Sequence, residues 1–234
     1  IRYQQDVSRI YAADLFGAGG GALLIILLLF TLLPGEALRY IAVLGMVALA
    51  LGSWELYRER VIRRVPLLLV FIVLPLLLPN SWLELEPSPY KGLTQTLRIS
   101  GAKVVGQRAS PLGVITVVGS PEVPFRHAPG MSLNAMGEPP EQVGLFIDGD
   151  AMTVITRDEG DREAFGYLDQ LTSALPYHIT EIDGVLILGA GGGSGVLQAR
   201  YHNVEEIRAV ELDRNIIDLV QGDYGDFSGH LYNR

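Results

Sequence analysis

Three long stretches without charged residues dominate the first third of the chain. They cover Leu15–Gly35, Tyr40–Trp54 and Val65–Leu83. Because roughly 20 apolar residues cross the hydrocarbon core of a bilayer as a helix, the first stretch is long enough to span it. The second is short for a crossing, and prolines interrupt the third. The pattern predicts a membrane region with two to three transmembrane helices over residues 1–84; the alternative for each stretch is a helix buried in a soluble core.

Short apolar and β-branched runs follow, separated by Pro, Gly, Ser and Asp residues that favour turns. Asp148 and Gly149 stand between two such runs and predict a tight hairpin. We therefore expect a small β-rich module over residues 85–160, with strands at 102–106, 113–118, 143–148 and 151–155. Beyond it, apolar residues at helical spacing predict one amphipathic helix from Phe165 to Leu175 that stops at Pro176.

From Gly184 onward, strand-like and helix-like segments alternate. Val185–Leu188 is a continuous apolar run, as expected of a buried parallel strand, and a helix-like segment and a second strand, Ile207–Glu211, follow it. Asp213 is placed to cap a further helix over 215–220. This order predicts the start of a truncated α/β domain of the Rossmann-like type over residues 161–234.

Charge divides the chain into two parts that suit different solvents. Residues 1–64 contain seven arginines and five acidic residues, a net charge of +2. The remaining residues carry a net charge of −10, which gives the total of −8 for the chain. The chain has no cysteine, which excludes disulfide scaffolds and Cys-ligated metal sites. Its acidity and its two lysines argue against a nucleic-acid partner.

The charges near the membrane region also bear on its orientation. Four arginines lie within Arg58–Arg64, and the positive-inside rule places that loop in the cytoplasm. If the third stretch then crosses, all later residues lie outside, whereas a nucleoside site should face the cytosol, so the topology stays open. We expect an integral protein of the cell membrane with a cytoplasmic catalytic domain. The chain begins with Ile1 and has no cleavage-site pattern, which indicates a segment of a longer membrane protein and not a signal peptide.

The pentapeptide Gly-Ala-Gly-Gly-Gly occurs twice, in two different contexts. At Gly17–Gly21 it opens the longest apolar stretch, where small residues at this spacing let helices pack closely in lipid. At Gly189–Gly193 it follows a predicted strand, and Glu211 ends the next strand. Such glycines let the backbone approach a ligand, and an acid about 20 residues on accepts hydrogen bonds from ribose hydroxyls. Because Ser194 replaces the last glycine of the dinucleotide motif, an adenosylmethionine-type nucleoside fits better than NAD. The alternative is a glycine-rich turn in another α/β protein.

From Tyr90 to Tyr232 the chain resembles the spermidine/spermine synthase (polyamine aminopropyltransferase) superfamily, in particular its membrane-fused, spermidine synthase-like branch. The segments that carry this resemblance are Tyr90–Leu93, Ser110–Gly113, Leu145–Gly149, Tyr167–Asp169, Leu175–His178, Val185–Gly195 and Ala209–Leu212, with Tyr11–Leu15 upstream.

The resemblance implies a fold of the class I adenosylmethionine methyltransferase type and roles for individual residues. The cofactor-binding residues would be Gly189, Gly191, Gly193 and Glu211, which would hold decarboxylated S-adenosylmethionine or methylthioadenosine. Asp148, Tyr167 and Asp169 would lie near the amine. Asp169 replaces the glutamate of the family, and Leu112, Gly113 and Met152 replace polar residues. The family's catalytic aspartate follows a fourth strand, beyond Arg234, so no catalytic residue is assigned and we expect this segment to be inactive alone.

Three functions remain open at this point. The first is a membrane-anchored transferase that moves an aminopropyl group to an amine such as putrescine, in polyamine biosynthesis. The second is an S-adenosylmethionine-dependent methyltransferase, and the third is a transport or sensor protein that binds a nucleoside without turnover. The expected partners are a small amine and the lipid bilayer, with self-association undecided. No metal site is predicted, because the four histidines lack metal-ligand spacing, and Asp223 and Asp226 are expected in a solvated loop.

Overall fold

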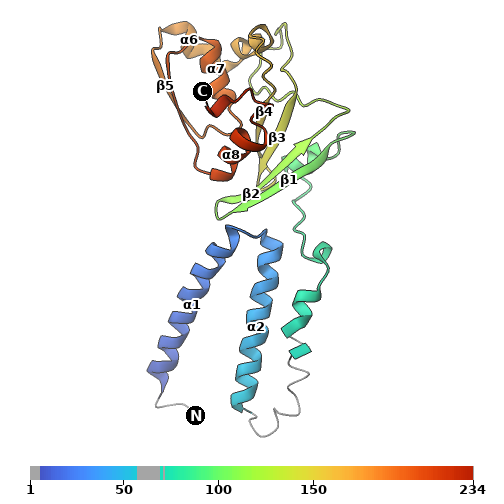
Figure 1. Ribbon diagram of the computed structural model, residues 1–234, viewed down its shortest axis with the longest axis vertical. Helices are drawn as coiled ribbons and strands as arrows, with labels where there is room; N and C mark the ends of the chain where they lie inside the picture. Colours follow the sequence, from blue (N-terminus) through green and yellow to red (C-terminus); the bar gives the residue numbers. More distant parts are fainter. Residues whose placement is uncertain (1–5, 57–68, 71, 234) are drawn as a thin grey trace. The chain divides into compact units, whose positions relative to one another are not determined.

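The computed structural model describes residues 6–56, 69–70 and 72–233 (Figure 1). The chain divides into two compact units. The first comprises Ile1–Glu86 with Ala109–Pro111, and the second comprises Pro87–Arg108 with Leu112–Arg234. The first boundary therefore falls two residues after the predicted one at residue 84.

Two long apolar helices form most of the first unit, α1 (Val7–Leu29) and α2 (Pro34–Leu56). Pro34 suits the first turn of α2, where its missing N–H costs nothing, and the Glu36 carboxylate accepts the Leu33 N–H at 3.1 Å. The second apolar stretch thus gains the residues before Tyr40 and becomes long enough to cross. Both helices are long and apolar enough to span a membrane, and α1 has no buried residue.

The third apolar stretch forms no such helix in its described part. Residues 65–68 and 71 lie outside the described residues, as do the four arginines of Arg58–Arg64. The later part of the stretch contains two short 3₁₀ turns, η1 (Leu74–Leu77) and η2 (Asn80–Trp82). Pro75 lies in the first turn of η1 and Pro79 immediately precedes η2, so prolines interrupt this stretch as the sequence predicts.

This segment returns alongside the first turns of α2. The Arg39 guanidinium donates to the Leu78 carbonyl oxygen at 2.8 Å and to Asn80 Oδ1 at 2.7 Å. Gly35 lies so close to the Leu83 carbonyl that a β-carbon there would collide with it. If α2 spans a bilayer, residues 78–83 therefore lie at the opposite membrane face from the end of α2.

The glycines of Gly17–Gly21 make no close helix contact with the described part of this chain. A β-carbon built at Gly17, Gly19, Gly20 or Gly21 would meet no atom within 4 Å. Close packing of Gly17–Gly21 against another helix in the lipid therefore stays a prediction.

The second unit contains a four-stranded sheet in the order β1-β2-β3-β4. Its strands are β1 (Lys103–Ser110), β2 (Gly113–Gly119), β3 (Gln142–Ile147) and β4 (Ala151–Thr156), preceded by the short helix α5 (Gly92–Thr96). Strands β2, β3 and β4 pair antiparallel. The predicted hairpin is confirmed: Asp148 and Gly149 have φ of 49° and 74°, which is the geometry that an Asp-Gly turn adopts most easily.

One parallel β–α–β element follows: β5 (Gly184–Leu188), α7 (Ser194–Tyr201) and β6 (Glu206–Val210). The predicted cap is confirmed, because Asp213 Oδ1 accepts the Asn215 N–H at 2.9 Å at the start of α8 (Arg214–Asp218). A single wide turn, Leu219–Asp223, and a 3₁₀ turn, η6 (Leu231–Asn233), end the described chain. The described residues thus contain one parallel strand pair, β5 and β6, and a separate sheet in which β2, β3 and β4 are antiparallel.

The predicted amphipathic helix over 165–175 is wrong. The segment instead forms 3₁₀ turns η3 (Glu163–Gln170) and η4 (Thr172–Ala174), and then helix α6 (Leu175–Ile179). Leu171 is extended and pairs with Met131, which interrupts the helix. Pro176 therefore lies in the first turn of a helix, where proline is favoured, and does not end one.

Within the second unit, one apolar cluster joins the later elements to the β-rich strands, and another joins the later elements to one another. In the first, α8 and the turn after it pack on the sheet through Ile216, Leu219 and Val220, against Ile115, Val117, Val143, Leu145 and Ile155. In the second, η3, α7 and η6 meet through Phe165, Tyr167, Leu168, Val196, Leu197 and Leu231. The predicted regions 85–160 and 161–234 therefore share cores and form one compact unit.

Candidate nucleoside site

The glycine-rich loop joins β5 to α7 in a sharp left-handed path. Gly191 and Gly193 have φ of 56° and 96°, conformations that side-chain-bearing residues rarely adopt. Gly189, also at positive φ, is exposed, and a β-carbon there would meet no atom within 4 Å. The loop is therefore open at its first glycine.

Glu211 lies directly beside this loop. Because β5 and β6 are parallel and pair Leu188 with Val210, the residues that follow each strand come together. The Glu211 carboxylate accepts the Gly191 N–H through Oε2 at 2.8 Å and the Asp213 N–H through Oε1 at 2.9 Å. The glycine loop and Glu211, which the sequence spacing predicts to act together, are thus in contact.

The later glycines of the loop serve packing against the sheet and the chain end. The Gly192 N–H donates to Thr153 Oγ1 on β4 at 2.9 Å. A β-carbon on Gly192 would strike the Val154 carbonyl, and one on Gly193 would strike Leu231. Gly191, Gly192 and Gly193 are all buried. Gly191 and Gly193 are predicted to contact a ligand; in the described structure Leu231 lies beside Gly193, and the ligand contact stays a prediction.

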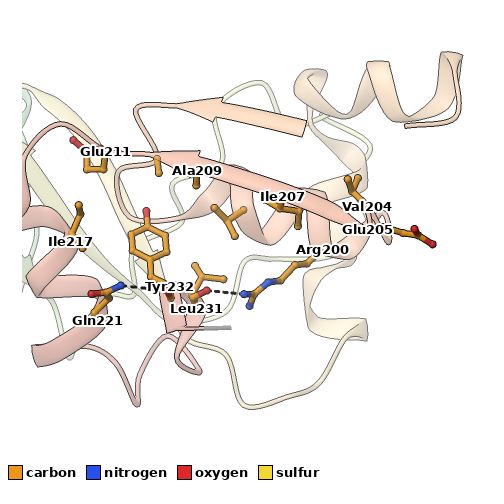
Figure 2. A pocket seen from close by; sticks show the side chains of 12 residues that line it. Arg200, Val204, Glu205, Ile207, Ala209, Glu211, Ile217, Gln221, Leu231 and Tyr232 are labelled. Carbon is orange, nitrogen blue, oxygen red and sulfur yellow. Dashed lines mark hydrogen bonds between the residues drawn. The ribbon is translucent and has the colours of Figure 1, made fainter. Parts of the chain in front are cut away.

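A cavity of about 630 Å³ runs along β6 from the Glu211 side of the loop (Figure 2). It is lined by Ala190, Val196, Arg200, Val204, Glu205, Ile207, Ala209, Glu211, Ile217, Gln221, Leu231 and Tyr232. Glu205 and Glu211 flank β6 and lie at the two ends of the cavity in Figure 2. The wall combines seven apolar residues with five polar or charged ones.

Tyr232 forms part of the wall and is held to the loop. Its hydroxyl donates to the Gly191 carbonyl oxygen at 2.7 Å. Burial, and then the negative charge of Glu211, raise the pKa of Tyr232, so the phenol stays neutral and keeps its proton for that bond. Sequence analysis did not select Tyr232, since nothing in its local pattern points to the loop 41 residues earlier.

The three residues predicted near an amine lie in different surroundings. Asp148 belongs to the hairpin, where its Oδ1 accepts the Val114 N–H at 2.9 Å. Tyr167 is 3% exposed in the second apolar cluster, and its hydroxyl shares hydrogen bonds with Thr156 and Gln142. Burial raises the pKa of Tyr167, and the hydrogen bonds oppose that shift. The role of Asp148, Tyr167 and Asp169 in substrate binding stays a prediction. Of these three residues, only Asp169 lines one of the two cavities described in the second unit.

Asp169 lies next to two histidines. Its Oδ1 is 2.8 Å from His178 Nε2 and 3.5 Å from His202 Nε2. Because the three residues lie in or beside separate elements, and His202 is far from the other two along the chain, their sequence spacing does not indicate the cluster. Asp223 and Asp226 are exposed and pair with Arg108 and His230, in agreement with the predicted solvated loop. The predicted catalytic aspartate, beyond Arg234, lies outside the described residues.

Comparisons with known proteins return no family model, no curated protein and no solved structure that matches this chain.

Proposed function

We propose that this chain is part of a membrane-anchored, spermidine synthase-like transferase that binds decarboxylated S-adenosylmethionine and passes its aminopropyl group to an amine such as putrescine. The observation that carries the proposal is the position of Glu211, held at the end of β6 beside the glycine loop and at the wall of a 630 Å³ cavity.

The Glu211 carboxylate has the capacity to bind a ribose as well as the loop. Each of its two oxygens accepts one backbone N–H, and a carboxylate has about four lone-pair sites. A second acceptor position on each oxygen is left for the two ribose hydroxyls. The space beside exposed Gly189 would receive the part of the nucleoside that approaches the loop.

In the proposed reaction, the amine nitrogen attacks the methylene carbon next to the sulfonium. A C–N bond forms, the C–S bond breaks with its electron pair going to sulfur, and methylthioadenosine leaves as a neutral thioether. The amine loses one proton to a base. The contribution of the described residues is to hold and orient the nucleoside, which lowers the entropic cost of the encounter.

Methyl transfer from S-adenosylmethionine is the second candidate, and the separate surroundings of Asp148 and Tyr167 favour it. Those residues support the sheet and the core and do not line the cavity beside Glu211. Both reactions need the same nucleoside site. They differ in the donor and in which carbon–sulfur bond of the sulfonium breaks, so that either an aminopropyl or a methyl group is transferred. Binding without turnover would instead fit a transport or sensor protein.

The proposed location is the cell membrane, with α1 and α2 crossing the bilayer and the second unit in the cytoplasm, where such nucleosides are available. The return of residues 78–83 along α2 sets a condition on this location. The second unit then leaves the membrane on the side of the α1–α2 loop, so a cytoplasmic unit requires Arg58–Arg64 to lie outside, against the positive-inside rule.

Calorimetry tests the nucleoside site with methylthioadenosine as the probe and the purified chain in detergent. Glu211→Gln keeps an acceptor for the loop amide but removes the charge. Because a hydrogen bond to a charged group contributes about 1.5–3 kcal/mol, we expect affinity to fall roughly 10- to 100-fold. Glu205→Gln is the matched control, since Glu205 lines the far end of the same cavity, and it should leave the affinity unchanged.

Two results would count against the proposal. Equal affinity of wild type and Glu211→Gln removes the ribose role of Glu211, and no binding of methylthioadenosine to wild type removes the nucleoside site. Turnover is measured separately, on the longest form of the protein. Methylthioadenosine formed from the decarboxylated substrate with putrescine supports aminopropyl transfer, whereas adenosylhomocysteine formed from S-adenosylmethionine supports methyl transfer.

A further inference from the structure

Three side chains with metal-binding atoms converge at one point of the second unit. Asp169 lies in η3, His178 lies in α6, and His202 immediately follows α7. The carboxylate oxygen and the two imidazole nitrogens all lie within 4.8 Å of one another. Convergence from three separate elements distinguishes this cluster from a histidine–carboxylate pair formed by neighbours in sequence.

His202 supplies the most informative observation. Its Nε2 is buried and makes no hydrogen bond to any described residue, although Asp169 Oδ1 lies 3.5 Å away. The ring is held in place by stacking on Tyr177, with centroids 4.4 Å apart and planes 3° from parallel. Buried polar atoms in proteins normally have a hydrogen-bond partner or a ligand, so this unpartnered nitrogen points to a ligand at the cluster.

We propose that Asp169, His178 and His202 bind a divalent transition-metal ion, for which Zn²⁺ is the probe. Two imidazoles and one carboxylate are a donor set that suits zinc and its neighbours. The proposal uses neither the glycine loop nor Glu211, and it does not depend on the proposed transferase function.

Two of the three separations between the ligand atoms are close to those around such an ion, and the third, between the two imidazoles, is at most 4.8 Å. Metal–ligand bonds of about 2.0–2.1 Å in a tetrahedral site place neighbouring ligand atoms about 3.3 Å apart. Asp169 and His202 already stand at 3.5 Å. The 2.8 Å pair of Asp169 and His178 has to open by roughly half an ångström, which the half-exposed His178 side chain can accommodate by rotation.

The cluster also borders an open space that can supply a further ligand. Asp169 and His178 line a second cavity of about 410 Å³, together with Ser132 and Thr172. Three protein ligands leave a fourth position, which water from this cavity fills.

The test is zinc titration of the 234-residue chain in detergent, purified without a polyhistidine tag and stripped with a chelator. A chromophoric chelator competing for Zn²⁺ reports affinity and stoichiometry. We expect one equivalent per wild-type chain, and at least about tenfold weaker binding for Asp169→Asn and for His178→Ala. His230→Ala is the matched control, because His230 and Asp226 form a histidine–carboxylate pair at 3.1 Å outside the cluster.

Co²⁺ in place of Zn²⁺ provides a second readout, since a tetrahedral site produces visible absorption that a loosely bound ion does not. Wild type and His230→Ala should show this absorption, and the two cluster variants should lose it. His178 is 53% exposed on its side chain, so His178→Ala leaves the core intact, and circular dichroism checks this.

Three results would overturn the proposal. The first is wild type without stoichiometric zinc, and the second is equal zinc affinity in all four proteins. The third is putrescine binding that needs Asp169 but not His178, in a protein that binds no zinc. That last result assigns the carboxylate to an amine and leaves the transferase proposal standing, so the two proposals can fail separately.

Discussion

Gly192→Ala tests whether the glycine loop is packed against the sheet. A β-carbon at Gly192 would stand 2.9 Å from the Ile155 backbone nitrogen and closer still to the Val154 carbonyl. Val154 and Ile155 are 1% and 0% exposed, in the paired part of β4, so the sheet cannot withdraw. Gly193 abuts Leu231 on the other side, which prevents the loop from moving.

The expected cost is set by these contacts. Forcing a methyl group into a packed interior costs about 1–3 kcal/mol. The hydrogen bond from Gly192 N–H to Thr153 Oγ1, at 2.9 Å, is lost as the loop shifts, for about 1 kcal/mol more. A total of about 2–4 kcal/mol lowers the melting temperature of a unit of this size by roughly 5–15 °C. Gly192 does not have positive φ, so the effect is steric and not conformational.

The matched control is Gly222→Ala. Gly222 is exposed, and a β-carbon there meets no atom within 4 Å. Because alanine loses less backbone entropy than glycine in a helical segment, this variant should equal wild type or gain up to about 1 kcal/mol. Thermal unfolding in detergent compares the three proteins. Hydrogen exchange of peptides that cover residues 184–212 shows whether the loop itself has opened.

The packing of the loop against β4 is contradicted if Gly192→Ala melts within about 2 °C of Gly222→Ala and its loop exchanges as in wild type. In that case the loop has room beside the sheet, and the later glycines are available to a ligand. A large loss of stability with increased hydrogen exchange outside residues 184–212 would also contradict the prediction that the contact with β4 causes the loss.

Two further predictions concern topology and pH. Because the chain lacks cysteine, a thiol reagent that does not cross the membrane reports on which side of a sealed vesicle a single introduced cysteine lies. Thr31→Cys and Met136→Cys should be labelled from the same side, and Ser8→Cys from the other. Labelling of residues 31 and 136 from opposite sides would contradict the return of residues 78–83 along α2. Burial lowers the pKa of both His202 and His127, so the unfolded chain binds their protons more tightly. In chelator, stability should therefore be complete above about pH 6.5 and decrease as the pH falls through the lowered pKa values. His202→Gln should flatten this dependence, and an unchanged profile would show that His202 does not cause it.

Several features of this protein could be predicted from sequence because their causes are local. The Asp-Gly hairpin, the cap at Asp213 and the strand–loop–helix around Gly189 depend on residues within a few positions of one another. The two apolar helices likewise form around charge-free apolar stretches, although α2 becomes long enough to cross only with the residues before Tyr40. Even the contact of Glu211 with the loop results from one rule, that parallel neighbouring strands bring their carboxyl ends together.

Other features were decided only by tertiary structure. The segment after Phe165 has helical spacing, yet it breaks at Leu171 because Met131, 40 residues earlier, pairs with it. Tyr167 has the pattern of a substrate contact, but its ring lies in a core that α7 completes.

The same holds for the histidines and for the loop. Asp169, His178 and His202 become neighbours only because three elements pack together, and Gly192 loses its open side only because β4 lies against it. In each case, a sequence pattern records the preferences of a residue for its near neighbours along the chain. Which distant residue arrives beside it depends on how the whole chain minimises exposed apolar surface, and no local pattern contains that result.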